Sequence, residues 1–134
     1  RVPNNDRVPA YFDTAHAALW DFIQSNNLKV IGPYMTLWHQ GPEVMENEVV
    51  EATFPINREV EGAGPVRVFP LPETRVISFT HRGKFSDFLV AHKVLANWLK
   101  EHDYPAAQSY REVYLRHEPG DMDNSITEVQ FPLD

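Results

Sequence analysis

The stretch Tyr110-Arg-Glu-Val-Tyr-Leu-Arg116 decides how the rest of the chain is interpreted. Side chains of a β-strand alternate between two faces, so its two tyrosines and Glu112 share one face, while Val113 and Leu115 share the other. We expect the aliphatic face to be core. The other face offers two aromatic rings around a carboxylate, which favours an organic cation or a planar molecule. An ordinary half-exposed antiparallel strand with Glu112 in water is the alternative.

The composition indicates one domain without disulfides. Its 134 residues are enough to bury a single core. There is no cysteine, which excludes disulfides and thiolate metal ligands and is compatible with the cytoplasm. No run approaches the ~20 apolar residues of a membrane span, and no signal peptide opens the chain, so we expect a soluble, cytoplasmic protein that does not contact the membrane. The 12 basic residues against 19 acidic ones, a net charge of −7, argue against nucleic-acid binding through this domain.

Hydrophobic spacing predicts two helices and several short strands. The helices are expected over residues 10–26 and 86–102, the second with Ser86 as its N-cap. The strands are expected over 34–39, 48–54, 66–69, 75–81, 110–116 and 125–133. Residues 1–9, 57–65 and 119–121 are predicted to be loops, because they are rich in proline, glycine, asparagine or charge.

The two halves of the chain repeat at a shift of 76 residues. Ala15-His16, Leu19 and Phe22 recur as Ala91-His92, Leu95 and Trp98, and Tyr34, Thr36 and Trp38 fall on Tyr110, Glu112 and Tyr114. This indicates a duplicated β-α-β-β unit, about 8–56 and about 66–134, with a pseudo-two-fold axis. We therefore expect one α+β domain over 1–134, with two helices on one face of an antiparallel sheet. If the first unit matches the second, its first strand falls at about residues 0–5, where the chain has only Arg-Val-Pro-Asn-Asn, so we expect that strand to be missing or upstream.

The repeat also assigns the faces of the sheet and so predicts a site. We expect the core face to hold Val50, Ala52, Phe54, Thr127, Val129 and Phe131. The ligand-binding candidates on the opposite face are Glu112, Tyr114, Tyr110, Trp38, Tyr34, Thr36, Glu128 and Glu51. Four rings around one off-centre acid would enclose a flat hydrophobic cation, each ring contributing about 0.5–2 kcal/mol. The alternative is that the rings only stabilise adjacent strands.

Other candidate sites are weaker. The six histidines show no metal-ligand spacing, so we expect no metal site. Nucleophile, phosphate and dinucleotide motifs are absent from the sequence, and we expect no cofactor. The remaining acids in and beside loops are expected to be solvated: Glu43, Glu46, Glu48, Glu59 and Glu61.

Three motifs resemble the GyrI-like small-molecule-binding domain, which is also the effector-binding domain of AraC- and MerR-type multidrug-sensing regulators. They are Gly32-Pro33-Tyr34, residues 111–115 (Arg-Glu-Val-Tyr-Leu) and residues 126–133 (Ile-Thr-Glu-Val-Gln-Phe-Pro-Leu). The resemblance covers nearly the whole chain. It implies a pocket between the two halves and Glu112 as the acid that receives cationic or aromatic effectors. If the chain belongs to a regulator, its DNA-binding domain lies outside these residues, since no helix-turn-helix is recognised.

The same resemblance leaves two alternatives. Some GyrI-like proteins are hydrolases of electrophilic aromatic compounds; here Glu112 would activate water or protonate the leaving atom, with Trp38 and Tyr114 orienting the substrate. Others inhibit a protein partner, which here would use loops 40–47 and 57–65. We expect ligand binding without turnover, because the sequence offers no second acid–base partner at a supportive spacing.

Overall fold

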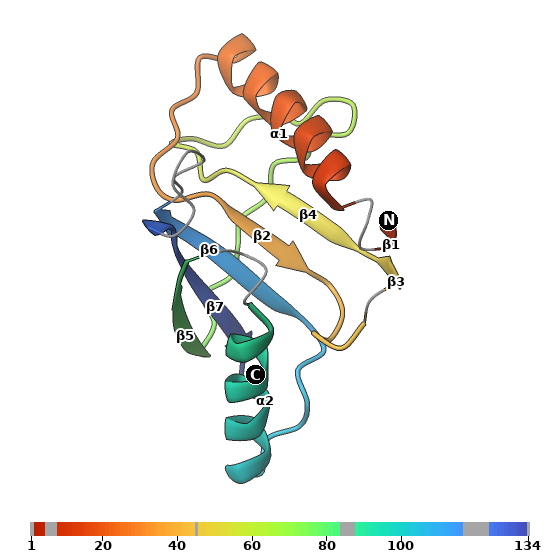
Figure 1. Cartoon of the computed structure of the whole chain (residues 1–134). Helices are drawn as coiled ribbons and strands as arrows, with labels where there is room; N and C mark the ends of the chain where they lie inside the picture. Colours follow the sequence, from red (N-terminus) through yellow and green to blue (C-terminus); the bar gives the residue numbers. More distant parts are fainter. Residues whose placement is uncertain (1, 5–7, 45, 84–87, 117–123, 134) are drawn as a thin grey trace.

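The computed structural model describes residues 2–4, 8–44, 46–83, 88–116 and 124–133. The elements are β1 (Val2–Asn4), α1 (Val8–Ser25), β2 (Met35–Trp38), β3 (Glu46–Glu48), β4 (Val50–Thr53), β5 (Val76–Arg82), α2 (Phe88–Glu101), β6 (Tyr110–Arg116) and β7 (Ile126–Pro132). One antiparallel sheet has the order β4-β2-β6-β7-β5, and β1 pairs with β3 in a second, two-stranded sheet (Figure 1). The predicted α+β fold is confirmed.

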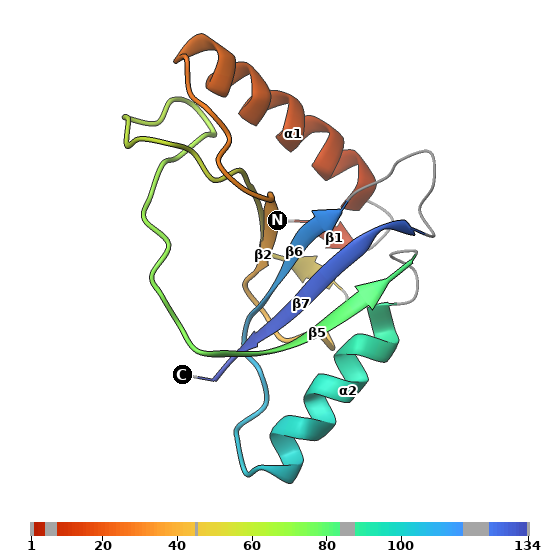
Figure 2. The same cartoon turned by 90° about the vertical axis from the view of Figure 1, so that its left-hand side faces the viewer.

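Both helices pack on the same face of the five-stranded sheet. From α1, the ring of Phe12 lies 6.3 Å from that of Trp38, centroid to centroid. From α2, the ring of His92 lies 5.0 Å from that of Tyr110. The helices lie toward opposite edges of the sheet, α1 near β4 and α2 near β5 (Figures 1 and 2). The middle of this face, on β2 and β6, therefore lies between them.

The main core lies under α2. Ala91, Leu95 and Leu99 recur every four residues, so they form one side of the helix, and all three are buried. They belong to one apolar cluster with Val129 and Phe131 of β7, both of which have no exposed surface. The periodicity that predicted this helix is thus the pattern that seats it on the sheet.

The edge of β4 is closed by a side chain of α1. The Tyr11 hydroxyl donates a hydrogen bond to the carbonyl of Val50 at 2.9 Å and accepts one from the N–H of Ala52 at 3.1 Å. An edge strand otherwise leaves such groups open to another strand. This contact fixes α1 beside β4.

The pairing register corrects the predicted faces. Residues directly across an antiparallel ladder share a face. Trp38 lies across from Val50, and Glu112 lies across from Val129. The aromatic residues and the predicted core therefore share one face, not opposite ones. We call it the helix face; the other, which we call the outer face, carries Met35, Leu37, Glu51, Thr53, Arg111, Val113, Glu128 and Gln130.

The predicted aliphatic core of β6 is only half right. Val113 on the outer face is buried, but Leu115 is 50% exposed. Alternation alone placed both on one face, whereas burial depends on what covers each position of that face.

The two halves of the sheet meet at equivalent positions. The order α1-β2-β4 recurs as α2-β6-β7, and β2 lies directly beside β6. Thr36 pairs with Glu112, which is its equivalent at the shift of 76 residues. A two-fold axis between matching halves requires such a pair to face each other, so the register agrees with the repeat. The duplication itself stays a prediction.

The structure differs from the predicted elements at three described places. The strand predicted over 48–54 is divided into β3, which ends at Glu48, and β4, which begins at Val50, and the two belong to different sheets. A first strand, expected to be missing or upstream, is present as β1, where Val2 pairs with Glu48 of β3. Pro3 is tolerated because a sheet edge does not need its missing N–H. The strand expected over 66–69 is absent, and an isolated bridge joins Ala63 to Val66 instead. The predicted cap Ser86 and loop 119–121 lie outside the described residues.

Candidate ligand-binding site at Glu112

The pairing of β2 with β6 assembles the predicted aromatic residues in the middle of the helix face. Trp38 lies across from Tyr110, and Thr36 across from Glu112. One step further along, the N–H of Tyr114 donates to the carbonyl of Tyr34 at 3.1 Å. Six predicted residues thus meet at one place, between α1 and α2.

Two hydrogen bonds fix the Glu112 carboxyl, and both reach the same oxygen. The indole Nε1 of Trp38 donates to Oε1 at 2.9 Å, and the hydroxyl of Tyr114 donates to it at 3.3 Å. The Tyr114 hydroxyl is also 2.7 Å from Oγ1 of Thr36. Among the described residues no hydrogen bond reaches the other oxygen, Oε2. Oε2 is therefore the acceptor that this carboxyl can offer to a ligand.

Two pairs of rings flank this carboxyl. The rings of Trp38 and Tyr110 are stacked, with centroids 5.6 Å apart and planes 7° from parallel. The rings of Tyr34 and Tyr114 are tilted, with centroids 5.3 Å apart. Aromatic faces carry partial negative charge, so both pairs can attract a cation as well as stack on a planar ligand.

Burial dominates the electrostatics of the site. Glu112 is buried, with 5% of the residue exposed. This burial raises the pKa of Glu112 to about 7, although the hydrogen bonds from Trp38 and Tyr114 act in the opposite direction. Burial, followed by the charge of Glu112, also raises the pKa values of Tyr110 and Tyr114. The two tyrosines therefore remain hydroxyl donors at neutral pH, while Glu112 is poised between its acid and its carboxylate.

Comparison with known proteins gives the family. The family described as the GyrI-like small molecule binding domain matches residues 1–134, the full length of the chain. The chain belongs to the GyrI-like family. No curated protein matches it.

Two solved structures share the fold of this GyrI-like domain. The C-terminal domain of EcmrR is 21% identical with a TM-score of 0.86, covering 99% of this chain and 85% of that one. EcmrR in a complex with DNA is also 21% identical with a TM-score of 0.85, covering 98% of this chain and 50% of that one. The GyrI-like domain thus spans half of the EcmrR chain in that complex. At this identity the likeness shows the fold alone.

A second acid of the GyrI-like domain is buried beside the site, contrary to prediction. Glu48 was expected to be solvated, but it is 3% exposed, and its Oε2 has no hydrogen-bond partner. Burial raises its pKa, and its charge contributes to the raised pKa values of Glu112 and Tyr110. The signal in the sequence was alternation, since Glu48 is two residues before Val50 of the helix face.

The histidines on the two helices line the same face. His92 contacts the rings of Tyr110 and Phe131, and its Nε2 has no partner. Burial lowers the pKa of His92, so the ring is neutral at pH 7. His16 stacks on Phe54, with ring centroids 5.6 Å apart. Within the described ranges no three His, Asp or Glu side chains form a group able to hold a metal ion.

Two predicted site residues lie away from Glu112. Glu51 and Glu128 are on the outer face, because each is the strand neighbour of a helix-face residue, Val50 and Val129 respectively. Glu51 binds His39 at 2.7 Å and Arg67 at 2.8 Å. Glu128 accepts a hydrogen bond from Gln130 at 2.6 Å. Both acids thus have partners of their own outside the aromatic site.

Neither α1 nor α2, the helices in the part of the chain that the structure describes, is both long enough and apolar enough to cross a bilayer.

Proposed function

We propose that this domain binds small hydrophobic aromatic molecules, preferably cations, at Glu112. The observation that carries the proposal is a buried carboxyl between two ring pairs, with one oxygen held by Trp38 and Tyr114 and the other left as an acceptor. Cation–π attraction and charge pairing would act on the same ligand.

The charge at the site supports a preference for cations. Glu112 forms no ion pair with any described Lys, Arg or His. The ion pairs among the described residues join Glu51, on the outer face, to His39 and to Arg67. Glu48 adds a second buried acid whose charge acts on Glu112. A bound cation would offset the cost of keeping a buried carboxylate ionised.

Ligand entry requires the packed rings to separate. Trp38, Tyr110 and Tyr114 are each less than 10% exposed, whereas Tyr34 is only half-buried. We infer that a planar ligand enters on the Tyr34 side and inserts between rings.

We further propose that the domain either senses hydrophobic aromatic ligands, as the effector-binding part of a transcriptional regulator, or sequesters them. The similar EcmrR chain, solved in a complex with DNA, is about twice as long as the matched region. A DNA-binding domain, in this proposal, lies outside the 134 residues, and no nucleic acid binds through this one.

Titration with ethidium, a planar aromatic cation, tests the proposal. We expect it to quench Trp38 with micromolar affinity, corresponding to about −8 kcal/mol. Trp20 is half exposed on α1, and Trp98 stacks on His102 elsewhere on α2, so part of the tryptophan emission should survive. Glu112→Gln should weaken binding at least about tenfold, because the neutral amide loses the charge pairing.

The matched control for this titration is Glu128→Gln. It removes one carboxylate from β7 on the outer face, so it changes the net charge equally without touching the site. Equal affinity of Glu112→Gln and the parent protein would show that this carboxylate is not the partner of the cation.

The hydrolase alternative is favoured by one observation. A carboxyl with a pKa of about 7 can donate or accept a proton near neutral pH, as a general acid or base must. Incubation with electrophilic aromatic compounds, followed by mass spectrometry, distinguishes turnover from binding. We expect the compounds to be recovered unchanged, because the ring pairs and the carboxyl are sufficient for recognition. Products formed by the parent and lost in Glu112→Gln would assign the domain to the hydrolases instead.

A further inference from the structure

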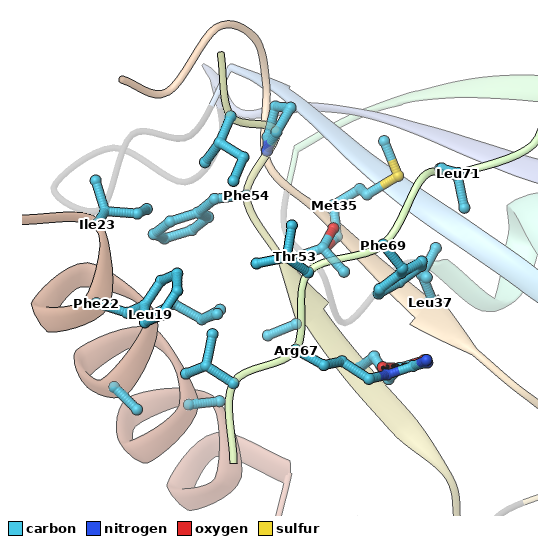
Figure 3. Close-up of a pocket in the computed structure, with 18 of the residues that line it drawn as sticks. Leu19, Phe22, Ile23, Met35, Leu37, Thr53, Phe54, Arg67, Phe69 and Leu71 are labelled. Carbon is cyan, nitrogen blue, oxygen red and sulfur yellow. Dashed lines mark hydrogen bonds and ion pairs between the residues drawn. The ribbon is translucent and has the colours of Figure 1, made fainter. Parts of the chain in front are cut away.

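A cavity of about 710 Å³ lies against the edge of β4, away from Glu112. It is bounded by α1, by β4 with part of β2, and by the segment 57–71 (Figure 3). Neither Glu112 nor Trp38, Tyr110 or Tyr114 lines it. Its volume is within the roughly 300–1,000 Å³ of small-molecule sites.

The walls of this cavity, which we call the β4-edge cavity, are mainly apolar. Three structural parts contribute side chains that point into it (Figure 3). They are Leu19, Phe22 and Ile23 from α1, Met35 and Leu37 from β2, and Phe69 and Leu71 from the segment 57–71.

The polar groups in the walls are largely paired with each other. Arg67 donates to both oxygens of Glu51, from Nε at 3.0 Å and from Nη2 at 2.8 Å. The hydroxyl of Tyr11 is used by the backbone of β4, and the hydroxyl of Thr53 donates to the carbonyl of Met35 at 2.9 Å. At the exposed rim, Arg58 donates to the carbonyl of Asn26. Four charged side chains line the cavity: Glu51 and Arg67 pair with each other, and Arg58 and Glu59 lie at the exposed rim. The inner walls therefore offer no separate charge that would call for an ionic ligand.

The segment 57–71 covers the cavity without forming a helix or a strand. Figure 2 shows the chain between β4 and β5 arching from the α1 end of the sheet to the start of β5. It is held by the Arg67–Glu51 contacts and by the side chain of Asn57, which accepts from the N–H of Lys29 at 2.9 Å. Leu71 is 44% exposed although it lines the cavity, so the cavity opens to solvent beside it.

We propose that the β4-edge cavity is a second binding site, which takes a small neutral apolar molecule. The apolar walls supply the binding energy, and the internally neutralised Arg67–Glu51 pair disfavours a charged ligand. A neutral ligand here and a cation at Glu112 occupy different places, so both bind at once.

Nile red, a neutral dye whose fluorescence rises in apolar surroundings, is the probe. We expect Leu71→Glu to weaken its binding at least about tenfold, because a carboxylate then lies at the apolar opening. The matched control is Leu115→Glu, which places the same charge at an equally exposed leucine of β6 that does not line the cavity. It should bind the dye within about twofold of the parent.

A second variant tests the cavity without adding charge. Ala18 lines it from α1, and Ala18→Phe should fill part of the volume and weaken Nile red binding while the circular dichroism spectrum remains that of the parent. Glu112→Gln should bind Nile red as the parent does, and ethidium should not displace the dye.

Any of four results would overturn the proposal. Leu71→Glu and Ala18→Phe could both retain the parent's affinity, which would place the dye elsewhere. Loss of Nile red binding in Glu112→Gln, or competition by ethidium, would place it in the aromatic site. Sedimentation showing a dimer that Leu71→Glu dissociates would make the cavity an interface between two copies.

Discussion

Glu112→Gln should stabilise the fold by roughly 3 kcal/mol at pH 8 and change it little at pH 4. The pKa of Glu112 is raised to about 7 by burial, from an ordinary value of 4.5. Between pH 4.5 and about pH 7, Glu112 holds a proton in the folded state that it has released in the unfolded state. The free energy of unfolding of the parent therefore falls as pH rises from about 4.5 to about 7, and this loss is complete above pH 7.

Glutamine removes this dependence and keeps an oxygen that can accept from Trp38 and Tyr114. Urea denaturation of both proteins at several pH values between 4 and 8 measures their free energies of unfolding. The difference between the two values cancels the titration of groups that both proteins share. Glu128→Gln on the outer face is the control for losing one acid. A difference between parent and Glu112→Gln that is independent of pH would contradict the buried, proton-binding carboxyl.

Affinity for ethidium should fall about tenfold for each pH unit below pH 7. Below the pKa of about 7, the cation must compete with the proton held by Glu112. Binding near pH 7 should therefore release a proton, which calorimetry detects as a heat that depends on the ionisation enthalpy of the buffer. Above pH 7 Glu112 is already ionised, so the affinity should become constant.

Two comparisons make this result specific to the site. In Glu112→Gln the slope with pH should disappear, because the competing proton has no group to occupy. A neutral planar aromatic should not follow the cation, since it gains nothing from an ionised Glu112. An unchanged slope in Glu112→Gln would assign the pH dependence to another group, with the buried Glu48 as the next to replace.

Local patterns in the sequence determined the helices, most strands and which aromatic residues accompany Glu112. Alternation in residues 110–116 placed Glu112 between Tyr110 and Tyr114, and the repeat associated these three with Tyr34, Thr36 and Trp38. Alternation succeeds here because it follows from backbone geometry within one strand, and it needs no knowledge of neighbouring elements. The family resemblance was confirmed over the whole chain.

Only the tertiary structure decided which residues share a face and which acids lie near Glu112. Alternation does not say which residues of two neighbouring strands share a face. The pairing of Trp38 with Val50 places Glu51 on the outer face, and the pairing of Glu112 with Val129 places Glu128 there. Glutamate is usually solvated, but Glu48 is buried because of its place beside the helix face. The β4-edge cavity likewise requires α1 and the distant segment 57–71 to meet at one strand edge. Burial and cavities depend on elements far apart in the chain, and a local pattern contains no record of that contact.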